Sequence, residues 1–374
     1  MFFCGRYGII KRKTEQKRRL TMCIKLNIGD AKLDEIVEAI KENSLSRNNF
    51  PRIIVGTGMS ASFGVPGMWK LANELENVLS KHKDSNIRAL WGAKAKDIKN
   101  SGLEDGLKSI TPAESVLVEE IKKITAYYIL QEEEKLHDDI RKVDSGFARL
   151  LLYLRDTCSV NNRVLDIMTP NYDRIIEMIC DRLCIGVITG FMGELYRIFN
   201  PNILKNPQKF YNIKDNFYVR LFKPHGSINW VRKGDEEFLT NDFSVLSDNS
   251  SYIEIITPGS SKYEVGLINN TFRTMREDFN ELISDISRPY SLFIYGYGFN
   301  DEHFNTVLFQ NENRNMLILS KEVKTDVIKR ALKNPHMTVF YEESKKNYII
   351  YKSEKYVIDE ALWDINNFAN IILG

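Results

Sequence analysis

The chain has 374 residues, of which 43% are hydrophobic and 27% charged, so it has the composition of a globular protein rather than a disordered one. Its length allows one large hydrophobic core or two smaller ones. The sequence contains no apolar run near the roughly 20 residues of a membrane span and no signal peptide. These features exclude a membrane protein as well as a disordered one.

The five cysteines form no CxxC pair and leave one thiol unpaired, which fits the reducing cytoplasm better than a disulfide framework. Cys180 and Cys184 are four residues apart, the spacing of two core-facing positions on a helix. No second pair of ligands accompanies them, so the sequence predicts no metal site.

The charge is concentrated at the N-terminus. Residues 1–25 carry eight Lys/Arg and one Glu, whereas the remaining chain carries 44 Lys/Arg and 49 Asp/Glu. Such a basic arm could bind nucleic acid. We favour a solvated, flexible extension, or an upstream start with Met22 as the working initiator.

The remaining chain alternates between strand and helix patterns. Asp30 can cap a first helix, in which Leu33, Ile36, Val37 and Ile40 lie on one face. Further helices are expected after residue 174, with Ile175, Ile176, Ile179 and Leu183 on one face, and over 321–333. The expected strands are 53–55, 164–169, 217–222, 252–257, 291–296, 315–319 and 337–341. This alternation predicts an α/β fold with one doubly wound parallel sheet, of the Rossmann-like type.

Two segments interrupt the alternation. Residues 76–150 predict a helical insertion, and its run QEEEKLHDDIRK is interpreted as a solvated face. Residues 185–216 predict an irregular excursion. The expected domain therefore spans 26–343, and residues 344–374 form a strand and a helix that dock on it.

A nucleotide-binding turn that lacks the usual lysine is suggested by residues 50–70, FPRIIVGTGMSASFGVPGMWK. A buried strand meets Gly56, Thr57 and Gly58, but no Gly-Lys-Ser/Thr follows, and Ala61 occupies the third position of a GxGxxG pattern. Loop amides, a helix N-terminus and serine hydroxyls can hold a pyrophosphate without a lysine.

Three further polar stretches follow apolar strands: Thr169–Asp173, Lys223–Trp230 and Gly296–His303. Each alone could have a structural role: a turn, a helix cap, a hydrogen-bonded loop histidine, or glycines that relieve backbone strain. If their strands share one sheet, all four stretches converge at its carboxyl edge. That crevice suits a dinucleotide better than a triphosphate.

In order along the chain, GTGMSASFGVP, TPNYD and KPHGSINW resemble three sirtuin motifs, and GYGFNDEHFN is similar to the corresponding loop of bacterial sirtuin-like domains. The resemblance covers about residues 50–310 and implies that the ligand is NAD. It implies that Asn171 positions the ribose and a water, that His225 is the catalytic base, and that Asp173 accepts from the nicotinamide carboxamide. The NAD-binding residues that it implies are Gly56, Thr57, Gly58, Ser60, Gly64, Pro66, Asn171, Asp173, Gly296, Tyr297 and Gly298.

The departures from the sirtuin pattern indicate which branch the chain resembles. Protein deacylases continue with Asp-Phe-Arg where this chain has Gly67, Met68 and Trp69, and they carry a four-cysteine zinc module where residues 226–290 contain no cysteine. The chain therefore resembles the NAD-hydrolysing domains of bacterial antiphage defence. The implied activity is hydrolysis of NAD to nicotinamide and ADP-ribose, without zinc, in abortive infection. An NAD-dependent deacylase and a non-catalytic NAD or ADP-ribose sensor remain alternatives.

The same resemblance implies partners. It suggests a homo-oligomer and a separate partner protein, either a HerA-type ATPase or an argonaute-like protein. The lack of a long apolar run predicts no membrane contact, and the cysteine usage predicts a cytoplasmic location.

Overall fold

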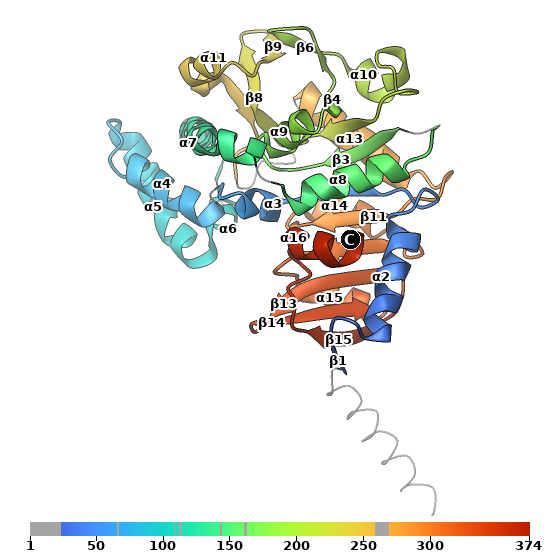
Figure 1. The fold of residues 1–374 in the computed structure, drawn as a ribbon. Helices are drawn as coiled ribbons and strands as arrows, with labels where there is room; N and C mark the ends of the chain where they lie inside the picture. Colours follow the sequence, from blue (N-terminus) through green and yellow to red (C-terminus); the bar gives the residue numbers. More distant parts are fainter. Residues whose placement is uncertain are drawn as a thin grey trace, which may run out of the picture.

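The computed structural model describes residues 24–65, 67–108, 110–111, 114–142, 144–160, 163–258 and 269–374. A ten-stranded sheet forms its centre, in the order β1-β15-β14-β13-β12-β11-β2-β3-β7-β4 (Figure 1). The strands are β1 (Ile24–Leu26), β2 (Arg52–Val55), β3 (Val164–Met168), β4 (Gly186–Ile188), β7 (Tyr218–Phe222), β11 (Leu292–Tyr295), β12 (Met316–Leu319), β13 (Met337–Glu343), β14 (Lys346–Tyr351) and β15 (Glu354–Ile358). Among these described strands, β14 alone runs against the others.

The topology confirms the doubly wound α/β prediction. From β2 the chain builds β3 and β7 on one side and later returns to place β11 on the other side of β2. The strand order therefore reverses between β2 and β11, and an open parallel sheet binds ligands where this reversal occurs.

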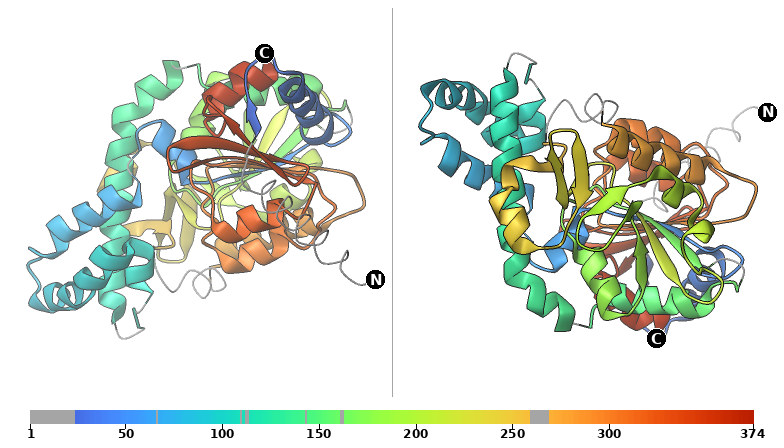
Figure 2. Two further views of the ribbon diagram at one scale, coloured as in Figure 1. Left: turned by 90° about the horizontal axis from the view of Figure 1, so that it is seen from below. Right: turned by 90° about the horizontal axis from the view of Figure 1, so that it is seen from above.

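Helices cover both faces of the sheet because strand side chains alternate between the two faces (Figures 1 and 2). In β2, Ile53 and Val55 belong to one core and Ile54 to the other. The first core includes α2 (Ala31–Ser44), α8 (Gly146–Thr157), α9 (Ile175–Arg182) and α16 (Ile365–Phe368). The second includes α13 (Asn270–Ser284), α14 (Glu302–Leu308) and α15 (Thr325–Ala331).

A second sheet, antiparallel and five-stranded, was not predicted. Its order is β10 (Ile253–Ile255), β8 (Gly226–Lys233), β9 (Glu236–Leu239), β6 (Arg197–Phe199) and β5 (Phe191–Met192). The prediction that 252–257 joins the main sheet was wrong, since β10 pairs with β8 here. The excursion at 185–216 is also more regular than expected: it contains β4, β5, β6, α10 (Pro201–Lys205) and a 3-10 turn at Pro207–Lys209. Strands of two or three residues are too short to show a period in sequence.

The inserted segment forms a helical lobe beside the sheet (Figures 1 and 2). It contains α4 (Met68–Leu79), α5 (Ser85–Ser101), α6 (Leu103–Leu107) and α7 (Ser115–Lys142). Leu75, Trp91, Leu107 and Leu117 belong to a separate core in this lobe. Helix α7 continues beyond the lobe to pack on β8 and β10, and α11 (Phe243–Asp248) joins the same packing.

The ends of the chain differ from prediction in detail. Two strands, β14 and β15, precede α16 and a π-helical turn at Ala369–Leu373, where one strand was expected. Ile24 and Lys25 belong to β1 rather than to the basic arm, because β15 offers them an edge to pair with. The rest of the predicted arm, residues 1–23, lies outside the described residues. Among the described helices, none has both the length and the apolar character to cross a membrane.

The cysteine pair is not on one helix face. Helix α9 ends at Arg182, and Cys184 is exposed in a left-handed conformation with φ 54°. Cys180 is fully buried, and burial raises the pKa of its thiol.

The glycine loops after β2 and β11 pack backbone against backbone. The Gly58 N–H donates to the Gly296 carbonyl at 2.9 Å. A Cβ at Gly58 would lie 2.6 Å from Gly296 Cα, and one at Gly56 would lie 2.4 Å from Gly296 O. Gly296 itself has φ 60°. These glycines are therefore required by the contact between the two loops.

We expect Gly58→Ala to lower the free energy of unfolding by about 1–3 kcal/mol, because the added methyl group overpacks this contact. Gly92→Ala in α5 is the matched control, since a Cβ there meets nothing within 4 Å and alanine favours a helix by about 1 kcal/mol. Urea unfolding measures both. Equal stability of the two variants would contradict the packing assigned to Gly58.

Candidate functional site

A cavity opens at the carboxyl edge of the main sheet. Its empty volume of about 1160 Å³ includes the mouth open to solvent. All four predicted stretches contribute to its lining, with Thr57, Ser60, Asn171, Asp173, His225, Tyr297 and Gly298. The fold thus brings together residues that are up to 241 positions apart in sequence.

Four predicted NAD-binding glycines, Gly56, Gly58, Gly64 and Gly296, are not among the residues that line the cavity. The N–H groups of Gly56 and Gly58 donate to the carbonyls of Tyr295 and Gly296, at 2.8 and 2.9 Å. Gly64 takes φ 89° after α3 (Thr57–Ser62). Pro66 lies outside the described residues.

Asn171 is held in one orientation by the first loop. Its Nδ2 donates to the Gly56 carbonyl at 2.9 Å and to Ser60 Oγ at 2.8 Å. Its buried Oδ1 has no hydrogen-bond partner among the described residues, and the residue is only 6% exposed. A buried acceptor of this kind requires a partner, and a ligand hydroxyl or a water in the cavity can supply one.

Asp173 is anchored from two sides. Its Oδ2 accepts from Ser60 Oγ at 2.5 Å, and its Oδ1 accepts from the Ile175 N–H, at the start of α9, at 3.3 Å. Asp173 therefore also serves the structural role of stabilising a helix start. Each carboxylate oxygen retains a second lone pair, so a ligand amide can still donate to it.

His225 lies between β7 and β8 and is 6% exposed. Its Nε2 is 3.8 Å from Asp301 Oδ2, while Asp301 Oδ1 accepts from the Phe304 N–H at 3.0 Å. Burial raises the pKa of Asp301, but the interactions with His225 and Phe304 outweigh it and hold this pKa below its usual range. Asp301 therefore remains a carboxylate facing the imidazole at neutral pH.

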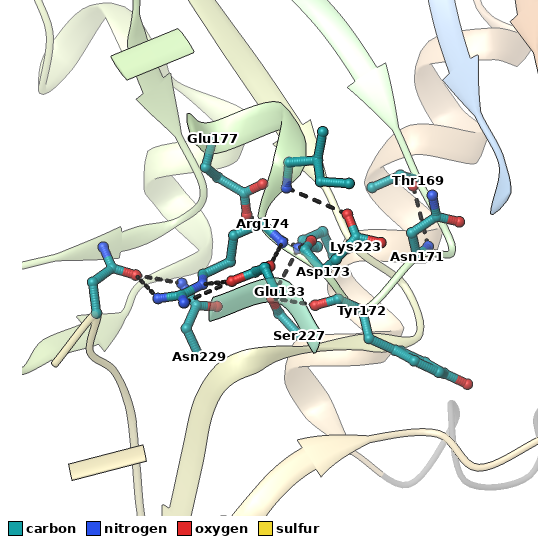
Figure 3. Close-up of polar contacts among 12 residues, drawn as sticks. Glu133, Thr169, Asn171, Tyr172, Asp173, Arg174, Glu177, Lys223, Ser227 and Asn229 are labelled. Atoms are coloured by element: carbon teal, nitrogen blue, oxygen red, sulfur yellow. Dashed lines mark hydrogen bonds and ion pairs between the residues drawn. The ribbon is translucent and has the colours of Figure 1, made fainter. Parts of the chain in front are cut away.

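A buried lysine fixes the loop that carries Asp173. Lys223 is 1% exposed, and its ammonium donates to the Asp173 carbonyl at 2.5 Å and to Ser227 Oγ at 2.8 Å (Figure 3). It also pairs with Glu177 at 3.1 Å. Because these contacts hold the backbone as well as the side chains, they determine where the Asp173 carboxylate lies.

Glu133 of α7 corrects the interpretation of QEEEKLHDDIRK as a solvated face. It is fully buried and accepts from Arg174 Nε at 2.7 Å and from the Arg174 N–H (Figure 3). Helical spacing places it on the inward face of α7 with Leu130 and Ile140, whereas Glu134 is exposed. Burial raises the pKa of Glu133, and the nearby Arg174 opposes that shift.

Some cavity residues gave little or no signal in the sequence. Glu104 comes from the helical lobe, and Arg276 and Asn280 come from α13, an ordinary amphipathic helix. Asp301 lies in a stretch that the sequence did select, but its contact with His225 depends on the fold. Within the described ranges, no three His, Cys, Asp or Glu residues are grouped as metal ligands.

Comparison with protein families matches residues 166–349 to the family described as SIR2-like domain. The match begins in β3 and includes Asn171, Asp173, His225 and Asp301, but not the first glycine loop. It supports membership of the sirtuin-like superfamily for the region covered. SIR2-like domains use NAD, so the match suggests an NAD-dependent activity. A search of curated proteins gives no match.

We expect Glu133→Ala to lower the free energy of unfolding by about 3–5 kcal/mol, because Arg174 would remain buried without its partner. Urea unfolding of Glu134→Ala, the exposed neighbour on the same helix, provides the control. A loss below about 1 kcal/mol in Glu133→Ala would contradict the role of this ion pair.

Asp301→Asn tests the ionised state of the carboxylate. A pKa held below its unfolded value contributes stability above that value, and this contribution is lost as the pH falls through the folded pKa. We therefore expect the free energy of unfolding to decrease less in Asp301→Asn than in wild type between about pH 5 and pH 2, because asparagine keeps the helix cap without the charge.

The control for Asp301→Asn is Asp326→Asn, an exposed residue in the first turn of α15. It should leave the acid dependence unchanged. Identical pH profiles for wild type and Asp301→Asn would show that Asp301 is not stabilised as a carboxylate.

Proposed function

We propose that this protein hydrolyses NAD to nicotinamide and ADP-ribose, with Asn171 and His225 acting on the reacting part of the substrate. The observation that carries the proposal is the buried Oδ1 of Asn171, which has no hydrogen-bond partner among the described residues and belongs to the cavity that His225 also lines. The SIR2-like match to residues 166–349 supports NAD as the ligand.

The reaction breaks the bond between the nicotinamide nitrogen and the ribose C1′ carbon. Nicotinamide leaves as a neutral molecule and the ribose becomes an oxocarbenium ion, so the leaving group needs little acid catalysis. A water oxygen then bonds to C1′ and releases one proton. The site must therefore orient the ribose and the water and receive that proton.

The described geometry provides a residue for each task. Asn171 is fixed through its Nδ2, which leaves Oδ1 to accept from a ribose hydroxyl or from the attacking water. His225 can receive the proton from the water or a ribose hydroxyl, and the adjacent Asp301 carboxylate stabilises the resulting imidazolium. Asp173 can accept from the nicotinamide carboxamide.

Hydrolysis of NAD also supports a biological role. We propose that the protein depletes NAD in the cytoplasm of an infected bacterium, as the resemblance to antiphage domains implies. Activation would then depend on a partner, either a HerA-type ATPase or an argonaute-like protein, and on assembly into a homo-oligomer.

The test is nicotinamide release from NAD by wild type, Asn171→Ala and His225→Ala, without peptide. We expect a loss of about 10²–10⁴-fold in His225→Ala, the range of general acid–base catalysis, and of about tenfold to hundredfold in Asn171→Ala. His303→Ala, an exposed histidine outside the cavity lining, should retain wild-type activity. Thermal unfolding checks that each variant is folded.

Other outcomes favour other functions. Release that requires an acyl-lysine peptide would indicate a deacylase, and binding of NAD without turnover would indicate a sensor. Because a partner can be required, NAD is also measured in cells that carry the protein with each candidate partner, before and after infection. Full activity of His225→Ala would reject the site assignment.

A further inference from the structure

The charges in the cavity are unusual for a site that binds a dinucleotide. Among the described lining residues, Arg276 is the only Arg or Lys, whereas Glu104, Asp173 and Asp301 contribute carboxyl groups. The pyrophosphate of a dinucleotide carries two negative charges near neutral pH. Its binding beside carboxylates requires a cation or several free donors.

The first glycine loop supplies few such donors. It has no lysine, and the Gly56 and Gly58 N–H groups already bond to carbonyls of the β11 strand and loop. The group that compensates the negative charge of the pyrophosphate must therefore come from another wall of the cavity.

Helix α13 supplies the missing charge. One side of this helix is buried in the core shared with the main sheet, through Phe272, Met275 and Phe279. This packing fixes the position of the Arg276 backbone. Arg276 lines the same cavity as Asp301, on the loop after β11, and its charge adds to the interactions that lower the pKa of Asp301. Tyr297 and Gly298 of that loop line the same cavity. Arg276 therefore shares one cavity with the loop that follows β11.

Asn280 gives a second, independent indication of a ligand. It follows Arg276 by one helical turn and also lines the cavity. Its buried Oδ1 finds no hydrogen-bond partner in the part of the chain that the structure describes. A ligand that donates a hydrogen bond would satisfy this acceptor.

We propose that Arg276 binds the pyrophosphate of the dinucleotide and that Asn280 accepts a hydrogen bond from the same ligand. The proposal rests on the proposed function and specifies its substrate class. Binding requires the diphosphate bridge, so the cavity selects NAD over nicotinamide riboside, which has the same scissile bond but no phosphate. An arginine suits this role because its planar group donates two parallel hydrogen bonds to phosphate oxygens.

The experiment measures binding of ADP-ribose by calorimetry to wild type, Arg276→Gln, Arg276→Lys and Arg273→Gln. ADP-ribose contains the pyrophosphate but no scissile bond, so binding is measured independently of turnover. We expect Arg276→Gln to weaken binding by about tenfold to hundredfold. Arg276→Lys should weaken it less, because the charge remains. Arg273→Gln removes the same charge from an exposed position on the same helix and should bind as wild type does.

Adenosine, which has no phosphate, separates charge recognition from a change in cavity shape. We expect it to bind wild type and Arg276→Gln equally. An equal loss of adenosine and ADP-ribose binding would overturn the proposal, and so would wild-type affinity of Arg276→Gln for ADP-ribose. If Arg276→Gln does not fold, ADP-ribose and adenosine binding are compared between Arg276→Lys and wild type. The proposal would be overturned if Arg276→Lys kept the wild-type affinity for ADP-ribose and that affinity did not depend on salt.

The outcomes for the hydrolase and for Arg276 are distinct. If wild type binds ADP-ribose but does not cleave NAD, the hydrolase is rejected while the role of Arg276 is still decided by the variants. If wild type cleaves NAD and Arg276→Gln does so with an unchanged KM, the role of Arg276 in binding the pyrophosphate is rejected, whereas the proposed hydrolase function is retained. If wild type does not bind ADP-ribose, the role of Arg276 is rejected.

Discussion

The contact between two glycine loops is the constraint on which the cavity depends. The Gly58 N–H donates to the Gly296 carbonyl, and the two backbones approach so closely that neither Gly56 nor Gly58 has space for a Cβ. This contact joins the ends of β2 and β11, where the strand order reverses. The loops therefore form one surface, from which Thr57, Ser60 and Tyr297 reach the cavity.

Buried charges then position the remaining polar groups. Lys223 holds the carbonyl of Asp173, and Glu133 holds the side chain and N–H of Arg174, the next residue. Removing one partner of such a pair leaves a charge without compensation in the interior, which makes these contacts costly to break. Since Glu133 comes from α7, the inserted helices and the loop that carries Asp173 are structurally connected. A shift of α7 would consequently also displace the loop that carries Asp173.

Among the described residues, the cavity combines buried acceptors that lack hydrogen-bond partners with one guanidinium, that of Arg276. Asn171 presents an acceptor at one wall, and Asn280 presents another on α13 beside Arg276. Hydrogen-bond acceptors suit the hydroxyl groups of a ribose, and the guanidinium suits a phosphate. A dinucleotide carries both kinds of group, so the proposed ligand would match both features of the cavity.

The sequence by itself determined six of the ten described strands of the main sheet, β2, β3, β7, β11, β12 and β13, and the four stretches at its carboxyl edge. Buried parallel strands are continuous apolar runs, and polar residues follow them directly. Only the tertiary structure decided the rest. Strands β5 and β6 of the second sheet are too short to show a period, and Glu133 lies in a charged run whose inward face appears only when α7 packs on α9. Likewise, Arg276 and Asn280 belong to an amphipathic helix whose pattern carries no sign of a ligand, and Asp301 meets His225 across 76 residues of chain. Local patterns record which face of an element is buried, whereas a site depends on which elements meet, and only the packed fold fixes that.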